Sequence, residues 1–297
     1  MPFFVIKGDL VSMNVDCIVN DSNVKLSMVE GVGRAIFHKA GDSVLARACK
    51  AIGHCDVGKA VMTDAFGITN TKAIIHAVGP IYINGKHDEE KNLISAYRCS
   101  LDLAINKGFK SIAFPLISGN FNYPLKECYD VAKKTIIDYL RQYNDLTIYL
   151  VIYKNFPPML TDDETLSLTK YIFDNASYNF AKQNKKESFS HLLNEGFKKS
   201  SLDLLELSLR SNLNQNLLNK IINEGFEDLT KNEIICLAIG LGFDKKQTNE
   251  LLISKGFVFE PTLVSDLIVC YCLDKKKNDI YLINDFLFQY NLSPLGE

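Results

Sequence analysis

The sequence lacks the features that mark membrane-spanning, exported and polyanion-binding proteins. No stretch reaches the roughly 18 apolar residues of a membrane-spanning helix, and the opening residues MPFFVIKGD have neither a basic start nor a long apolar core. Lys and Arg number 33 against 35 Asp and Glu. The formal net charge of −2 argues against a general polyanion binder, which needs a clear basic excess. We therefore expect a cytoplasmic protein that does not contact membranes.

The cysteines and histidines lack the spacing of metal sites. The eight cysteines contain no Cys-x-x-Cys pair, so we expect thiols in a reducing compartment in place of disulfides or a zinc site. His54 and His76 are too scattered in the sequence to indicate a metal, and we expect them to be loop and core residues. The sequence therefore predicts neither a bound metal nor a cofactor.

The first half of the chain has the pattern of an α/β fold. Runs rich in β-branched and aromatic residues predict the strands FFVIK, CIVN, AVMTDA, AIIHAVG, SIAFPLI and TIYLVIY. Apolar residues at helical spacing predict helices over Glu89–Asn106 and Leu125–Tyr139. Because the strands are apolar on both faces, both faces must be covered, which predicts a three-layer α/β/α sandwich.

The second half of the chain has a different pattern, with no convincing strand after NFPPML. The stretch DDETLSLTKYIFDN predicts a helix whose first turn is acidic, as the helix dipole favours. The polar stretch ASYNFAKQNKKES predicts a linker, and short helices separated by glycines follow it. The expected organisation is an α/β domain over 1–160, a helix and linker over 161–186, and a small all-α domain over 187–297.

Three loops of the α/β domain are candidates for one ligand site. Ligands of open α/β sheets bind where loops leave the carboxyl ends of the strands, often against helix N-termini. The loops are Gly8-Asp9-Leu10, the stretch from Asn20 to Ala35, and PLISGNFNYP at 115–124. Each loop alone is common, but the three in this order indicate a site for a phosphorylated ligand. In the third loop, backbone N–H groups of Ser118, Gly119 and Asn120 and the ring of Phe121 are expected to face the ligand.

Residues 1 to about 153 resemble the macrodomain, the ADP-ribose-binding module. The matching stretches are KGDLVSMNVDCIVNDSN, GVGRAIFHKAG, GHCDVGKAVMT, AIIHAVGPIY, NLISAYRCSLDLAINKGFKSIAFPLIS and FNYP. The resemblance covers about half the chain, and its motifs are specific in combination. It implies a mixed central sheet flanked by helices, with a cleft for adenine, two riboses and a diphosphate.

The resemblance also implies roles for single residues. Asp9 resembles the carboxylate that accepts a hydrogen bond from the adenine amino group, with Leu10 beside it. Asn20 and Asn23 resemble the paired asparagines of the family, of which the second faces the distal ribose and is the candidate catalytic residue. The residues that resemble the two diphosphate loops are Gly31, Val32 and Gly33, at a helix N-terminus suited to anions, and Ser118, Gly119, Asn120 and Phe121, the last against the distal ribose.

Three departures from the family pattern affect the distal pocket. Many hydrolytic members have Gly-Val-Asp-Gly where this chain has GVGR at 31–34, so a carboxylate that helps to place the attacking water is missing at Gly33. Glu30 replaces part of a glycine run and adds a negative charge beside a phosphate site, which costs on the order of 1 kcal/mol or more. The second loop is shorter than usual and has Asn122 in place of glycine, a mild change because Asn tolerates the left-handed conformation.

The expected function is therefore binding of ADP-ribose or a derivative, as a reader or an eraser of ADP-ribosylation. The alternative is an enzyme, either an ADP-ribosyl hydrolase or an O-acetyl-ADP-ribose deacetylase, because a substrate phosphate can itself position or activate water. Gly33 favours binding, whereas Asn23 near the distal ribose favours turnover. An ADP-ribosylated protein is a further candidate partner.

The tail resembles the helical C-terminal region of some bacterial macrodomain proteins. Its core also resembles a helix-turn-helix, in which Gln215–Asn223 would be the recognition helix. Five residues could then reach base edges, namely Asn214, Gln215, Asn216, Asn219 and Lys220. From residue 186 onward, however, 12 Lys and Arg face 16 Asp and Glu, so the basic footprint of a DNA reader is absent. DNA binding is the less favoured interpretation, and docking of a protein partner or a second copy of the chain is the alternative.

Overall fold

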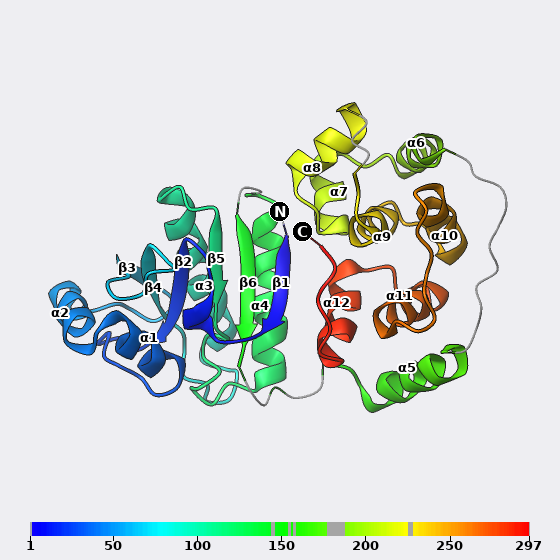
Figure 1. The fold of residues 1–297 in the computed structure, drawn as a ribbon. Helices are drawn as coiled ribbons and strands as arrows, with labels where there is room; N and C mark the ends of the chain where they lie inside the picture. Colours follow the sequence, from blue (N-terminus) through cyan, green and yellow to red (C-terminus); the bar gives the residue numbers. More distant parts are fainter. Residues whose placement is uncertain are drawn as a thin grey trace. The chain divides into compact units, whose positions relative to one another are not determined.

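The computed structural model describes residues 2–143, 146–153, 156, 159–176, 188–224 and 228–296. The chain forms two compact units, residues 3–157 and residues 158–297, and residues 1–2 group with the second (Figure 1). Most of the polar stretch predicted as a linker lies outside the described residues.

The first unit is built on one mixed sheet. Its strands are β1 (Phe3–Lys7), β2 (Cys17–Ser22), β3 (Ala60–Asp64), β4 (Ala73–Val78), β5 (Ser111–Phe114) and β6 (Thr147–Ile152). Their order across the sheet is β1-β6-β5-β2-β4-β3. All neighbouring pairs are parallel except β3 and β4, which are antiparallel. The predicted strands and the mixed sheet are thus confirmed.

The first face of the sheet is covered by α1 (Val32–Ala40) and α2 (Asp42–Ile52). Ile36 and Leu45 from these helices share a buried core with Ile18 of β2. The short 3₁₀ helix η1 (Leu10–Ser12) adds Leu10 to the same core. Successive residues of a strand point to opposite faces, so Asn20 and Ser22 of β2 lie on the face of Ile18, and Asp21 lies on the other face.

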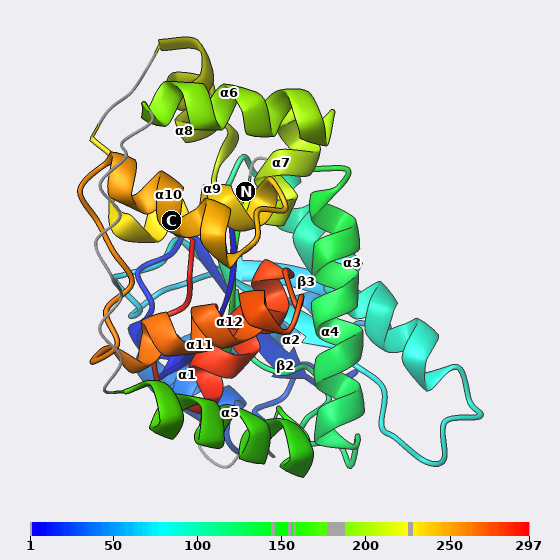
Figure 2. The same ribbon diagram turned by 90° about the vertical axis from the view of Figure 1, so that its right-hand side faces the viewer.

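The second face is covered by α3 (Glu89–Asn106) and α4 (Leu125–Leu140), which Figure 2 shows side by side. Tyr97 of α3 meets the ring of Phe114 on β5, with centroids 5.2 Å apart. The neighbouring Ala113 belongs to the core on the first face. The alternation along β5 therefore divides the side chains between two layers of helices, and the predicted three-layer α/β/α arrangement is confirmed.

Within residues 159–176, 188–224 and 228–296, the second unit contains helices joined by turns and loops, and no strand. Its elements are α5 (Asp162–Asn175), α6 (Phe189–Ser200), α7 (Leu204–Ser211), α8 (Gln215–Asn219), a π-helical turn (Lys220–Glu224), α9 (Lys231–Gly240), α10 (Lys245–Ser254), α11 (Val264–Asp274) and α12 (Ile280–Gln289). The helix predicted from its acidic first turn is α5, and a capping box between Thr161 and Glu164 sets its start. The predicted all-α character of this region is confirmed.

Close backbone packing holds the centre of the helical unit. The side chains of α9 from Ile234 to Ile239 are all buried. At the end of this helix, a Cβ on Gly240 would lie 2.8 Å from the Cβ of Ser211, so only glycine allows α7 and α9 to approach this closely. None of the helices in the described residues is long and apolar enough to cross a membrane.

Candidate functional site

The three predicted loops meet at one edge of the sheet. β1, β2 and β5 belong to a continuous parallel set with β6 and β4, so their carboxyl ends point the same way. Asp9 follows β1, Asn23 follows β2, and the loop from Pro115 to Pro124 follows β5 and leads into α4. Parallel pairing thus brings together segments that lie more than a hundred positions apart in the sequence.

Asp9 is held by the short helix that follows it. Its Oδ1 accepts a hydrogen bond from Val11 N–H at 3.3 Å, and its Oδ2 accepts one from the Ser12 hydroxyl at 3.3 Å. The carboxylate is therefore the N-cap of η1, and it remains exposed to solvent. Leu10, beside it, is buried in the core.

Asn20 is part of a buried chain of hydrogen bonds that runs to β4 and β3. Its Nδ2 lies 3.1 Å from Nδ1 of His76, and Nε2 of His76 lies 3.0 Å from Oγ1 of Thr63. Thr63 donates its hydroxyl proton to the carbonyl of Asp64, so its oxygen accepts from Nε2–H and Nδ1 accepts from Asn20. Burial lowers the pKa of His76 to about 4, which keeps the ring neutral. His76 is a buried residue of β4, as predicted, and Oδ1 of Asn20 is left without a partner among the described residues.

Asn23, the predicted catalytic residue, is bound to its own loop. Its Oδ1 accepts from the backbone N–H groups of Lys25 at 3.0 Å and Ser27 at 3.2 Å. Its Nδ2 donates to the Ser27 hydroxyl at 2.8 Å. The side-chain amide thus organises residues 24–27, a use of Asn that is common in turns.

The first diphosphate loop leads directly into α1. Gly31 is the N-cap of α1 and has φ of 80°, a conformation that favours glycine. Gly33 is buried, and a Cβ at this position would lie 3.3 Å from Oδ1 of Asn20. Glu30 forms an exposed ion pair with Arg34 at 3.1 Å. Arg34 thus offsets the negative charge that the sequence predicted beside the phosphate site.

Several backbone N–H groups of the second diphosphate loop donate to other atoms of the protein. Ser118 N–H donates to Oδ1 of Asp21 at 3.1 Å, and Gly119 N–H donates to the carbonyl of Leu116 at 3.1 Å. Phe121 N–H likewise donates to the carbonyl of Ser118 at 2.9 Å. In this structure the N–H groups of Ser118 and Gly119 therefore have partners within the protein, because buried or tightly turned backbone satisfies its own donors. Their contact with a ligand stays a prediction.

The two diphosphate loops also touch each other. A Cβ on Gly31 would lie 3.1 Å from Nδ2 of Asn120, so the exposed amide of Asn120 reaches the start of α1. Asn122 adopts φ of 62°, the left-handed conformation that Asn was expected to tolerate there. The ring of Phe121 is partly exposed, and its carbonyl accepts from Tyr82 N–H at 3.0 Å.

Asp21 and Ser22 are residues of this edge that sequence reasoning missed. Both side chains are buried, and the atoms Asp21 Oδ2, Ser22 Oγ and Ser118 Oγ have no partner among the described residues. Burial raises the pKa of Asp21 to about 7, although the N–H of Ser118 acts in the opposite direction. The signal was present in the sequence, because a carboxylate inside an apolar strand is unusual.

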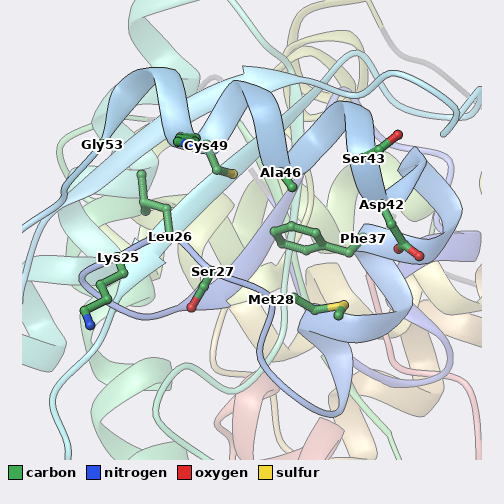
Figure 3. A pocket seen from close by; sticks show the side chains of 11 residues that line it. Lys25, Leu26, Ser27, Met28, Phe37, Asp42, Ser43, Ala46, Cys49 and Gly53 are labelled. Atoms are coloured by element: carbon green, nitrogen blue, oxygen red, sulfur yellow. The ribbon is translucent and has the colours of Figure 1, made fainter.

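A hollow of about 580 Å³ lies behind the Asn23 loop, between residues 25–28 and the helices α1 and α2 (Figure 3). Its apolar lining includes Leu26, Met28, Phe37, Ala46 and Cys49. None of the residues predicted to bind the ligand lines it. The hollow is thus separate from the predicted site.

The predicted recognition helix of the second unit is short. α8 spans Gln215–Asn219, and the remainder of the predicted segment continues as the π-helical turn to Glu224. Asn214 caps the helix by accepting from Leu217 N–H at 2.8 Å. The side chains of Asn216, Asn219 and Lys220 are exposed. Their contact with DNA stays a prediction.

Comparisons with known proteins cover about half of the chain. The Macro domain family model matches residues 19–132, a range that includes both diphosphate loops. The chain is 41% identical over 170 residues to an O-acetyl-ADP-ribose deacetylase of Salmonella gallinarum, covering 55% of this chain and 89% of that protein. It is 42% identical over 155 residues to a protein of the same name from Cronobacter turicensis, covering 50% and 87%. A solved structure of the Oceanobacillus iheyensis macrodomain with ADP is similar, with 31% identity, a TM-score of 0.48, and coverage of 51% of this chain and 83% of the other.

Proposed function

Because this chain belongs to the macrodomain family, we propose that its first unit binds ADP-ribose or a derivative at the carboxyl edge of the sheet. The observation that carries the proposal is the convergence of Asp9, the start of α1 and the 115–124 loop at that edge. Two family relatives, of which this chain covers 89% and 87%, are named for an ADP-ribose derivative. The eight unpaired cysteines are consistent with the proposed cytoplasmic location.

In this proposal the start of α1 faces the diphosphate. The first N–H groups of a helix have no partner within the helix, and the helix dipole favours an anion there. Arg34 and the amide of Asn120 are near this point and can add hydrogen bonds. Phe121 would pack against the distal ribose, and Asp9 would accept from the adenine amino group, the roles that the family resemblance implies.

Titration calorimetry with ADP-ribose tests the proposal. Asp9→Ala should weaken binding at least about tenfold, since a hydrogen bond to a charged group contributes about 1.5–3 kcal/mol. Asp9 is also a helix cap, so Asp9→Ser is the matched control that keeps a capping oxygen while removing the carboxylate. Loss of affinity in both variants supports the adenine role. Wild-type affinity in both variants, or no binding by the wild type at millimolar ligand, would contradict it.

A second candidate function is hydrolysis of O-acetyl-ADP-ribose, favoured by the names of the relatives at 41% and 42% identity. Against it stand Gly33, where no carboxylate can place water, and Asn23, whose amide is bound to its own loop. Acetate release from O-acetyl-ADP-ribose and ADP-ribose release from modified proteins distinguish the two functions. Turnover of either substrate that Asn23→Ala abolishes would identify an enzyme.

We also propose that the helical unit binds a protein partner or a second copy of the chain. The support is its acidic balance, with 16 Asp and Glu against 12 Lys and Arg from residue 186 onward. An acidic surface repels the phosphates of DNA, so binding through α8 is the weaker alternative. Light scattering with and without ADP-ribose would reveal self-association.

A further inference from the structure

Asp21 is a buried carboxyl group directly beneath the second diphosphate loop. Only 3% of its surface is exposed. Its side chain lies on the face of the sheet that α3 and α4 cover. Its Oδ1 accepts from Ser118 N–H at 3.1 Å, and its Oδ2 has no partner among the described residues. Oδ1 can accept from the Ser118 N–H whether Asp21 is protonated or ionised. If Asp21 were ionised, however, the negative charge shared by Oδ2 would be buried without a hydrogen-bond partner, which is costly.

Among the residues that the structure describes, no cation compensates the Asp21 carboxyl group. The titratable side chains that face it are Tyr97 from α3 and Cys128 from α4. Burial raises the pKa of both, so both are neutral near pH 7. Within the described residues, burial and the Ser118 N–H are the influences on Asp21, and neither is a Lys or Arg. Burial therefore favours the neutral carboxyl and raises the pKa of Asp21 to about 7.

The contact with Asp21 sets the conformation of the loop above it. Ser118 has φ of 67°, which is unfavourable for a residue with a side chain, so neighbouring contacts must hold it there. Gly79 lies against its other side, since a Cβ on Gly79 would be 2.2 Å from Ser118 Oγ. The carbonyl of Ser118 then accepts from Phe121 N–H, which places the end of the loop.

We propose that Asp21 is the positioning residue of the second diphosphate loop, that it acts in its protonated form, and that binding of a diphosphate ligand is therefore coupled to proton uptake from solvent. This inference rests on the proposed function. The ligand brings two negative charges to the loop, and a buried carboxylate below it would repel them in a medium that screens poorly. Ligand binding and protonation of Oδ2 thus favour each other, and linkage makes the effect reciprocal.

Affinity for ADP-ribose as a function of pH tests this inference. Between about pH 6 and about pH 8 the wild type should lose about tenfold in affinity, because a growing fraction of Asp21 must first take up a proton. Calorimetry at about pH 8 in buffers of different ionisation enthalpy should show uptake of close to one proton per ligand. His76, with its pKa lowered to about 4, is neutral over this range and cannot produce the effect.

Asp21→Asn is the informative variant because its amide has the shape of the neutral carboxyl and keeps an oxygen for Ser118 N–H. Its affinity should be independent of pH in the same range, and its binding should take up no proton. Asp64→Asn, at an exposed carboxylate on β3, is the matched control and should follow the wild-type pH profile. If Asp21→Asn does not fold, the proton count of the wild type still decides. Wild-type binding without pH dependence or proton uptake overturns the inference alone, whereas absence of binding at every pH overturns the proposed function.

Discussion

Gly33 and Asn20 lie side by side at the start of α1, where the proposed site has a hydrogen-bond acceptor but no carboxylate at residue 33. Oδ1 of Asn20 is buried, has no partner in the part of the chain that the structure describes, and lies 3.3 Å from the position of a Cβ on Gly33. The other end of the Asn20 amide is used by His76, so this oxygen keeps its direction. A hydrogen-bond acceptor is thus available beside the start of α1, but no ionisable group is present at residue 33 to accept a proton from water.

Gly33→Asp should add hydrolytic activity to the proposed ADP-ribose site. The new Cβ would lie 3.3 Å from Asn20 Oδ1 and 3.3 Å from the Cβ of Val29, so we expect folding to lose roughly 1–3 kcal/mol from tight packing. The helix dipole offsets about 0.3–1 kcal/mol of that loss. Affinity for ADP-ribose should be similar or weaker, and hydrolysis of O-acetyl-ADP-ribose should increase. Gly33→Asn, of the same size but without a charge, controls for packing.

The wild type could already hydrolyse O-acetyl-ADP-ribose fast, with Gly33→Asp no faster. That result would show that another group positions the attacking water. The binding interpretation would then be wrong. Equal rates for Gly33→Asp and Gly33→Asn would attribute any gain to a changed pocket shape and not to the carboxylate.

Asp21 should also make the stability of the first unit depend on pH. Its pKa is raised from 3.8 to about 7 by burial, so the folded state binds this proton more tightly than the unfolded state. The resulting stabilisation is complete below the unfolded pKa and is lost as pH rises through about 7. The free energy of unfolding of wild type should therefore fall relative to that of Asp21→Asn as pH rises. From about pH 4 to about pH 8, the difference between the two proteins should change in favour of Asp21→Asn by on the order of 2–4 kcal/mol.

Urea unfolding of both proteins across this range measures the difference. His76 has the opposite sign, because its pKa is lowered to about 4 and its contribution is lost as pH falls. Both proteins share His76, so it cancels when they are compared. A constant difference between wild type and Asp21→Asn at all pH values would mean that Asp21 does not titrate in this range.

At the scale of elements, the loop between β4 and α3 supports the second diphosphate loop. Tyr82 N–H donates to the carbonyl of Phe121, and the rings of Tyr82 and Tyr123 have centroids 4.8 Å apart. Glu89, at the start of α3, organises the supporting loop by accepting from the backbone N–H groups of Ile83, Asn84, Gly85 and His87. The two loops are therefore one packed assembly, and a change in one should reach the other.

Gly79→Ala should displace this assembly. The added Cβ would lie 2.2 Å from Ser118 Oγ and 2.6 Å from a methyl group of Ile117, so the second loop must move. We expect a loss of roughly 1–3 kcal/mol in stability and a more than tenfold loss in ADP-ribose affinity, on the order of 1.4 kcal/mol or more. Thermal unfolding and titration calorimetry measure the two effects.

Gly108→Ala is the control for this prediction. Gly108 has φ of 72° and nothing within 4 Å of a Cβ, and it lies before β5, at the opposite edge of the sheet from the site. It should lose about 1 kcal/mol in stability from backbone strain alone, with unchanged affinity. Equal affinities for Gly79→Ala and wild type would mean that the ligand does not depend on the second loop.

At the scale of the whole molecule, each unit has its own buried core. The first contains a complete sheet with helices on both faces, and the second is organised around the buried α9 and α11. Met159 and Leu160, just after the division near residue 157, are buried in the second unit. The Macro domain match at residues 19–132 falls entirely within the first unit.

A chain that ends at residue 157 should therefore fold and bind ADP-ribose as the full chain does. No strand or covering helix of the first unit is removed by the cut, so its core is kept. Circular dichroism and titration calorimetry on both lengths test this expectation. A shortened chain that folds but binds at least tenfold more weakly would show that the helical unit contributes to the site.

The elements and their ends were determined largely by the sequence alone. The predicted helices Glu89–Asn106 and Asp162–Asn175 have the same bounds in the structure, because apolar spacing and caps such as the Thr161–Glu164 box are local features. The motif order also predicted which loops would converge, since parallel strands align their carboxyl ends. The ion pair of Glu30 with Arg34, at helical spacing, was equally local but was overlooked.

The state of the site was decided by tertiary structure. The N–H groups of Ser118 and Gly119 were expected to be free, but Ser118 donates to Asp21, a residue 97 positions away in the sequence. Asp21 is buried because distant helices pack over it, which the sequence around Asp21 does not show. This burial raises the pKa of its carboxyl group. Hydrogen-bond partners and desolvation depend on which distant segments pack together, whereas helical and strand periodicity depends only on neighbours along the chain.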